Sequence, residues 1–193
     1  MSTTTGAIAE PELNVGISSE PMETDEALYE LVNCQRVEVP PMSVLATRIA
    51  TRLGTRLSGF VEAQHCGEVF VEGLFHLPLT EDSSRKRRPD ITYVSYERRP
   101  ADRPLNPYAD AGDTVPDLAI EVTSPSDRAE AQRGKVLEYF RAGVGYVWVV
   151  YPILRLVDVY ESESVVHSYG PDDTLKGGPV LPGFQLPLAE LFC

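Results

Sequence analysis

The amino-acid sequence predicts a single α/β domain, built on one mixed β-sheet that is flanked by helices. The chain has 193 residues, 42% of them hydrophobic and 24% charged, which suits one soluble domain with a well-formed core. Segments with the apolar period of a helix alternate with segments that have the period of a strand. Residues 117–151 have the order strand, helix, strand, so the two strands of this βαβ unit are expected to be parallel neighbours.

The first half of the chain is predicted to contain two helices and several strands. Leucine and isoleucine side chains recur every four residues within 43–58 and predict a helix there, with arginines along its other side. Thr24, followed by acidic residues, predicts a short helix over 24–32. Strands are predicted at 35–39, 60–65, 68–77 and 90–95.

The second half is predicted to hold the central strands and the crossover helix. Residues 117–123 alternate between apolar and other side chains and form a strand, and residues 126–142 form a helix that ends at Gly143. The segment 97–115 is a loop long enough to suggest a partner, a substrate or disorder. The remaining predicted elements are strands at 146–151, 155–161 and 165–169 and a helical turn at 187–192.

The acidic charge is concentrated near the N-terminus. The formal net charge is −12, and residues 1–30 contain seven acidic residues and no lysine or arginine, which leaves −5 for the remainder. We expect a flexible acidic tail at 1–22 and one domain at 23–193. A net charge of this sign argues against a protein that coats DNA by charge alone. It does not exclude a nucleic-acid enzyme, because carboxylates that hold metal add to the same total.

Several classes of protein are disfavoured by the bulk sequence. The three cysteines are far apart, which argues against a disulfide framework or structural zinc and fits a reducing cytoplasm. No signal peptide is apparent, and the longest uncharged stretch, 142–154, is too short to cross a membrane. We therefore expect a cytoplasmic protein with no membrane partner. A free sheet edge makes a homodimer plausible, although no residue specifies one.

Two carboxylates and one lysine stand out as candidates for chemistry. Glu121 lies inside an otherwise apolar strand, where a carboxylate is costly unless it is paired or binds metal. Asp90 opens another strand, so the two carboxylates can converge on a hard divalent cation. Asp117 lies four residues before Glu121 on the same strand, about 13 Å away at ~3.3 Å per residue, and cannot share that ion. Lys135 lies in the helix that follows, positioned to lean over the strand ends.

Polar side chains on that helix, and a basic run before Asp90, are candidates for binding substrate. Lys135 shares a stripe at helical spacing with Arg128, Gln132 and Tyr139, and of these Gln132 and Tyr139 are taken as candidate substrate-binding residues. Packing in the core is the simpler interpretation of Tyr139. The basic run is expected to hold flanking phosphates, although such runs are more often solvated loops. Its members are Arg85, Lys86, Arg87 and Arg88.

These segments together resemble the Uma-two restriction endonuclease family, which belongs to the PD-(D/E)xK nuclease superfamily. The resemblance covers about 29–192 and is specific in the order and spacing of its motifs. It rests on RRPDI at 87–91, PDLAIEVTSPS at 116–126, YELV at 29–32, VEVPPMS at 37–43 and the segments 135–140, 142–144 and 146–150. It implies the restriction-endonuclease-like fold.

The resemblance also implies roles for individual residues. Asp90 and Glu121 would be the metal carboxylates, and Glu38 a candidate additional acid. The superfamily lysine normally stands two residues after the acid, where this chain has Thr123. In the Uma-two family that lysine has moved into the following helix, which makes Lys135 the candidate. The implied cofactor is Mg²⁺, with Mn²⁺ as a substitute.

The leading expectation is a Mg²⁺-dependent endonuclease that hydrolyses DNA phosphodiester bonds. The cation would activate a water, and Lys135 would position that water or stabilise the developing charge. The displaced lysine and the negative net charge favour an alternative, a nuclease-fold binding or regulatory protein with weak or no catalysis. A metal-dependent hydrolase of a small phosphorylated substrate is a third interpretation.

Overall fold

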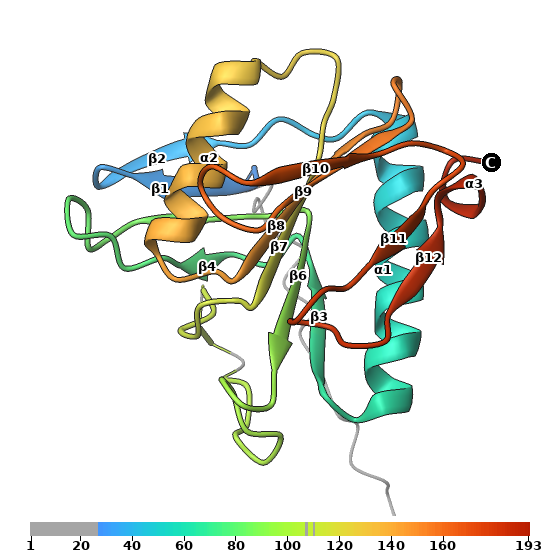
Figure 1. The fold of residues 1–193 in the computed structure, drawn as a ribbon. Helices are drawn as coiled ribbons and strands as arrows, with labels where there is room; N and C mark the ends of the chain where they lie inside the picture. The colour runs from blue at the N-terminus through green and yellow to red at the C-terminus, as the bar shows by residue number, and fades with distance from the viewer. Residues whose placement is uncertain (1–26, 107, 110) are drawn as a thin grey trace, which may run out of the picture.

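A computed structural model describes residues 27–106, 108–109 and 111–193, so the predicted tail at 1–22 lies outside the described residues. A mixed six-stranded sheet forms the centre of the fold (Figure 1). Only the pair of strands that flanks the crossover helix is parallel in this sheet, which confirms the predicted βαβ unit. In spatial order the strands are β10 (Val166–Tyr169), β9 (Leu156–Tyr160), β8 (Tyr146–Tyr151), β7 (Leu118–Val122), β6 (Ile91–Ser95) and β3 (Gly67–Val71).

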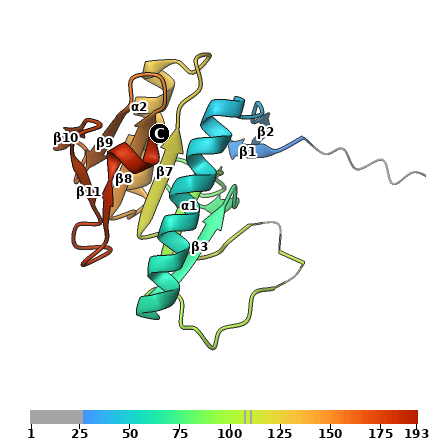
Figure 2. The same ribbon diagram turned by 90° about the vertical axis from the view of Figure 1, so that its right-hand side faces the viewer.

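Helices cover both faces of the central sheet. The long helix α1 (Val44–Gln64) packs on one face, together with the short C-terminal helix α3 (Leu188–Leu191), and Figure 2 shows α1 lying along the sheet. The crossover helix α2 (Ala129–Arg141) packs on the opposite face. Strand β7 is buried on both sides because its residues alternate between the two cores. In the described part of the chain, no helix qualifies as a membrane span.

The prediction of a single sheet is wrong, because the described part of the structure contains three sheets. A four-stranded sheet lies beside the central one, and a two-stranded sheet lies near the C-terminus. Both are built from strands of two to four residues, which are too short to produce a periodic signal in the sequence. They consist of β2 (Gln35–Glu38), β1 (Tyr29–Val32), β5 (Lys86–Arg87) and β4 (Phe75–His76), and of β11 (Thr174–Lys176) and β12 (Gln185–Pro187).

Two of the predicted elements have a different secondary structure. Residues 29–32 form a strand rather than the end of a helix, because Asn33 and Cys34 adopt positive φ angles of 51° and 59° and turn the chain into a hairpin. The predicted strand at 60–65 is the last part of α1, where Val61 continues the buried face. The helix ends at His65 in the left-handed conformation.

The start of α1 is tied to the loop that follows β7. Ser43 caps α1 by accepting a hydrogen bond from the Ala46 N–H, and its own N–H donates to Ser124 Oγ at 3.3 Å. The Asp127 carboxylate accepts the Ser124 N–H at 2.7 Å and closes that loop. These bonds bring the segment before α1 and the N-terminal end of α2 to the same end of the central sheet.

A close approach at the start of β3 gives a test of the packing between β3 and β6. A Cβ atom on Gly67 would lie 2.3 Å from the Val94 carbonyl oxygen, whereas a Cβ on Gly59, in α1, would meet nothing within 4 Å. We expect Gly67→Ala to lower the free energy of unfolding by about 2–3 kcal/mol, because backbone must move. Gly59→Ala is the control, and should raise it by about 0.5–1 kcal/mol. Equal effects in urea titration would contradict this packing.

Candidate functional site

Asp90, Glu121 and Lys135 line one cavity of about 130 Å³ at the end of β7. The structure therefore brings together the three residues that the sequence singles out. The walls come from the segment before α1, from the loop after β7 and from the first turns of α2. The other lining residues are Val39, Pro40, Pro41, Met42, Val122, Ser124, Ser126, Asp127, Arg128, Ala131 and Gln132.

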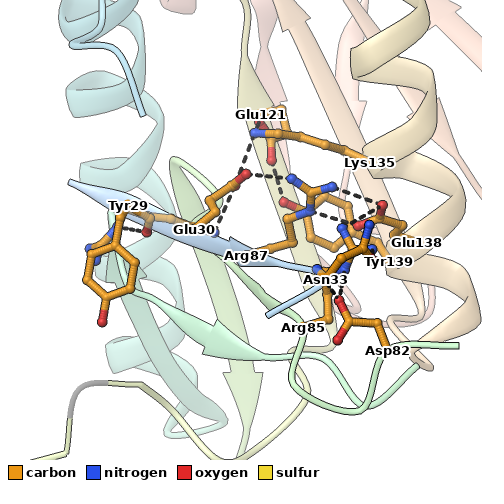
Figure 3. Close-up of polar contacts among 11 residues, drawn as sticks. Tyr29, Glu30, Asn33, Asp82, Arg85, Arg87, Glu121, Lys135, Glu138 and Tyr139 are labelled. Atoms are coloured by element: carbon orange, nitrogen blue, oxygen red, sulfur yellow. Dashed lines mark hydrogen bonds and ion pairs between the residues drawn. The ribbon is translucent and has the colours of Figure 1, made fainter. Parts of the chain in front are cut away.

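Glu121 is held from two sides by α2. Its side chain projects from β7 toward the helix and is only 5% exposed. Lys135 Nζ lies 3.0 Å from Glu121 Oε2, and the Tyr139 hydroxyl donates to Glu121 Oε1 (Figure 3). Burial and the charge of Glu121 raise the pKa of the Tyr139 hydroxyl well above its ordinary value, so this group stays a donor.

Asp90 stands next to Glu121 in the sheet. Ile91 pairs with Ile120 in the antiparallel ladder of β6 and β7, so the next position outward places Asp90 opposite Glu121. The Asp90 carboxylate accepts the Val122 N–H at 2.5 Å. Burial and the neighbouring charge of Glu121 raise the pKa of Asp90 to about 7. The fold thus holds two like charges close together, an arrangement that a cation would relieve.

Glu30 is a member of the site that the sequence analysis missed. It lies on β1, is 4% exposed, and places Oε1 3.3 Å from Lys135 Nζ. Its carboxylate also accepts from Arg87 Nη1 at 2.5 Å and from the Arg88 N–H at 3.1 Å. Burial would raise the pKa of Glu30, but the charges of Lys135 and Arg87 outweigh it and hold that pKa below its ordinary value. The sequence signal for Glu30 as a site residue is the YELV segment at 29–32, although by composition Glu30 groups with the acidic residues near the N-terminus.

Lys135 remains a cation in this setting. Burial alone would lower the pKa of its amine, but the charges of Glu121 and Glu30 outweigh burial and raise it above the ordinary value. The amine therefore contributes positive charge and hydrogen-bond donors at neutral pH, rather than acting as a proton acceptor. Thr123, where the superfamily lysine would stand, instead donates its hydroxyl to the Val150 carbonyl at 3.2 Å.

Most of the basic run points into the protein rather than toward a ligand. Arg87 binds Glu138 through Nε at 2.7 Å and Nη2 at 2.9 Å, and also binds Glu30. Arg85 is 6% exposed and forms ion pairs with Asp82 and Glu138. Both guanidinium groups thus already pair with carboxylates of the protein, whereas the sequence analysis expects them to hold flanking phosphates.

The remaining candidates are divided between the site and its surroundings. Arg88 is half-buried and donates to the carbonyl oxygens of Tyr29 and Glu72, and Lys86 lies on β5. Gln132 lines the cavity, and Tyr139 is fully buried in the core beneath Glu121. Glu38 is exposed on β2 and is not among the lining residues. It pairs with Tyr29, so it lies on the opposite face of the hairpin from Glu30.

The donor set fits a hard divalent cation that keeps several waters. Within residues 27–106, 108–109 and 111–193, no three histidine, cysteine or acidic side chains gather into a metal cluster. The cavity instead offers two carboxylates, Asp90 and Glu121, both held by hydrogen bonds. Mg²⁺ is commonly bound in proteins by one or two carboxylates together with water and substrate phosphate. The residues present therefore suit Mg²⁺ or Mn²⁺ better than zinc.

The buried pairing of Arg87 predicts a large loss of stability on its removal. Arg87→Met leaves Glu30 and Glu138 without their shared cation, so we expect the free energy of unfolding to fall by about 3–5 kcal/mol. Arg56→Met is the control, because Arg56 pairs with Glu190 at the surface and should contribute less than about 1 kcal/mol. Chemical denaturation of both variants measures the difference, and similar losses would contradict the role of Arg87.

The raised pKa of Asp90 predicts a pH-dependent stability of the metal-free protein. Asp90 keeps its proton up to about pH 7 in the folded state but only up to about pH 3.9 in the unfolded state. The stability that this proton contributes is therefore full below about pH 3.9 and is lost as the pH rises from there through 7. Asp90→Asn mimics the protonated form. In the presence of a chelator, we expect the variant to melt about 2–4 °C or more above wild type near pH 8. Near pH 4 the two proteins should melt at the same temperature. A variant that is less stable at the higher pH would contradict the assignment.

Comparisons with known proteins agree with this fold. The chain matches the family Uma2, described as "Putative restriction endonuclease", over residues 18–189. It is similar to the crystal structure of "a putative nuclease belonging to DUF820" from Anabaena variabilis, with a TM-score of 0.73 and 18% identity over 85% of this chain and 89% of that chain. No curated protein matches the sequence. Because the family match spans most of the chain, this protein belongs to the Uma2 restriction-endonuclease-like family.

Proposed function

We propose that this protein is an endonuclease that hydrolyses DNA phosphodiester bonds with Mg²⁺, or Mn²⁺ in its place, bound by Asp90 and Glu121. The observation that carries the proposal is the convergence of Asp90, Glu121 and Lys135 on one cavity in a member of the Uma2 family. Two carboxylates with one cation beside them are the groups that metal-assisted phosphodiester hydrolysis requires.

The chain's own residues would orient the reacting groups. Asp90 and Glu121 would hold the divalent cation, which would supply Lewis-acid polarisation of the phosphodiester and activation of a water. Tyr139 fixes the Glu121 carboxylate from one side and the Val122 N–H fixes Asp90, so both are held before a ligand arrives. The Lys135 ammonium donates to a phosphate oxygen and stabilises the charge that develops on it. Its retained charge suits this electrostatic role.

Glu30 and Arg87 would act as positioning residues. Glu30 holds the Lys135 amine at 3.3 Å, and Arg87 holds Glu30. This support matters because a lysine on a helix has a long flexible stem, and its head needs fixed partners to be placed within the site. The helical lysine can therefore serve the site from a different element than the strand position occupied by Thr123.

A cleavage assay tests the proposal directly. Purified full-length protein is incubated with plasmid, single-stranded and branched DNA in Mg²⁺ or Mn²⁺. We expect Asp90→Asn and Glu121→Gln to reduce the rate about 100-fold or more, and Lys135→Met about 10–100-fold. Lys176→Met is the matched control, since Lys176 is exposed on β11 outside the lining of the cavity, and should cleave like wild type.

Two other outcomes would change the assignment. Equal cleavage by wild type and Asp90→Asn would place the activity elsewhere or in a contaminant. Divalent-cation binding that depends on Glu121, without cleavage of any DNA, would favour a nuclease-fold binding or regulatory protein. The existing ion pair between Lys135 and Glu121 favours that second reading, because a bound cation must compete with the ammonium for the same carboxylate.

A further inference from the structure

A larger cavity of about 410 Å³ adjoins the candidate site. The two share four lining residues, Ser124, Asp127, Arg128 and Gln132, so a ligand at Asp90 and Glu121 can extend directly into the second space. Its floor is formed by α2, and its far wall is formed by the turn between β8 and β9. Among the other lining residues are Arg133, Ile153, Leu154 and Tyr160.

Two hydrogen-bond donors in this cavity have no partner within the described protein. Gln132 Nε2 and Arg133 Nη1 are both buried and both unpaired. The other terminal nitrogen of Arg133 donates to the Glu163 carbonyl, which fixes the guanidinium in place. Buried donors in folded proteins nearly always find an acceptor. Both residues line the larger cavity, so a ligand there that supplies acceptors would satisfy these donors once their side chains turn toward it.

The rest of the cavity presents flat and apolar surfaces. The Arg133 guanidinium lies over the Tyr160 ring, with its carbon 5.1 Å from the ring centroid. Ile153 and Leu154, at the rim, are 66% and 64% exposed. Apolar side chains exposed at the mouth of a cavity are available to contact the apolar face of a ligand. A planar, partly apolar group with acceptor atoms at its edge satisfies both the donors and these surfaces.

We propose that this second cavity binds one unpaired nucleobase of the strand whose phosphate lies at Asp90 and Glu121. The proposal rests on the proposed function and narrows its substrate class. Gln132 and Arg133 donate to acceptor atoms on the base edge, while Ile153 and Leu154 contact one of its faces. Every nucleobase carries such acceptors, so the site discriminates little between bases. A base inside a continuous duplex cannot reach this space, and the preferred substrate is therefore single-stranded or locally unpaired DNA.

The first test moves one abasic nucleotide stepwise along a single-stranded oligonucleotide on both sides of the mapped cleavage position. We expect removal of the base at one neighbouring position to slow cleavage about tenfold or more, with smaller effects elsewhere. A matched fully paired duplex should be cleaved about tenfold or more slowly than the single strand. No position effect, an equal effect at every position, or equal cleavage of duplex and single strand would overturn the proposal.

Two variants separate the base cavity from the catalytic cavity. Leu154→Asp and Ile153→Asp each place a charge at the rim, at residues that line only the larger of the two cavities. In both variants we expect the abasic effect, which is the slowing of cleavage when the base is removed, to shrink to about twofold or less. The reason is that these variants have already lost part of the surface that binds the base. Leu105→Asp is the control, since Leu105 is 61% exposed and lines a different cavity, and its abasic effect should equal that of wild type. An unchanged abasic effect in Leu154→Asp would overturn the proposal.

A binding measurement distinguishes failure of this inference from failure of the nuclease assignment. Calorimetry in Ca²⁺ compares deoxyadenosine 5′-monophosphate with 2-deoxyribose 5-phosphate, which lacks the base. We expect the nucleotide to bind about tenfold or more tightly, and Leu154→Asp to remove that advantage. If no DNA is cleaved but the nucleotide still binds more tightly than the sugar phosphate, the nuclease assignment fails and the base cavity stands. If DNA is cleaved and both ligands bind equally, the nuclease assignment stands and the base cavity fails.

Discussion

A buried guanidinium joins the two parts of the chain that form the candidate site. Arg87 on β5 binds Glu30 on β1 and, through two nitrogens, Glu138 on α2. Burying three charges is costly unless each finds its partners, so this cluster is stable in few arrangements of the helix and the small sheet. The cluster therefore fixes where α2 lies, and with it the position of Lys135.

The site alternates acidic and basic groups over a short distance. Glu121 and Glu30 contact the Lys135 ammonium, Asp90 lines the same cavity as Lys135, and Arg87 neutralises Glu30. The carboxylates keep the lysine charged, and the buried neighbour Glu121 raises the proton affinity of Asp90. A divalent cation would relieve the repulsion between Asp90 and Glu121.

Elements with strong local patterns were predictable from the sequence, and those that depend on distant partners were not. β7, α2 and β8 were found because apolar periodicity and a helix-ending glycine define them locally. Residues 29–32 carry a helix prediction in the sequence but form strand β1 of a hairpin, because the turn depends on positive φ angles at Asn33 and Cys34 that these residues adopt only in context. The sequence pattern ends the first long helix at residue 58, earlier than the end of α1 at Gln64, because Val61 is compatible with both a helix and a strand.

The sequence by itself determined that Asp90 opens one strand, that Glu121 lies inside another and that Lys135 follows on the crossover helix, because apolar periodicity and helical spacing are local properties. That the two strands are neighbours is a property of the tertiary structure. Only the tertiary structure decided that Glu30 completes the site and that Arg85 and Arg87 point inward. A basic run looks the same in sequence whether its charges face water or buried carboxylates. The difference depends on which distant acids the fold brings within about 3 Å, which no local pattern records.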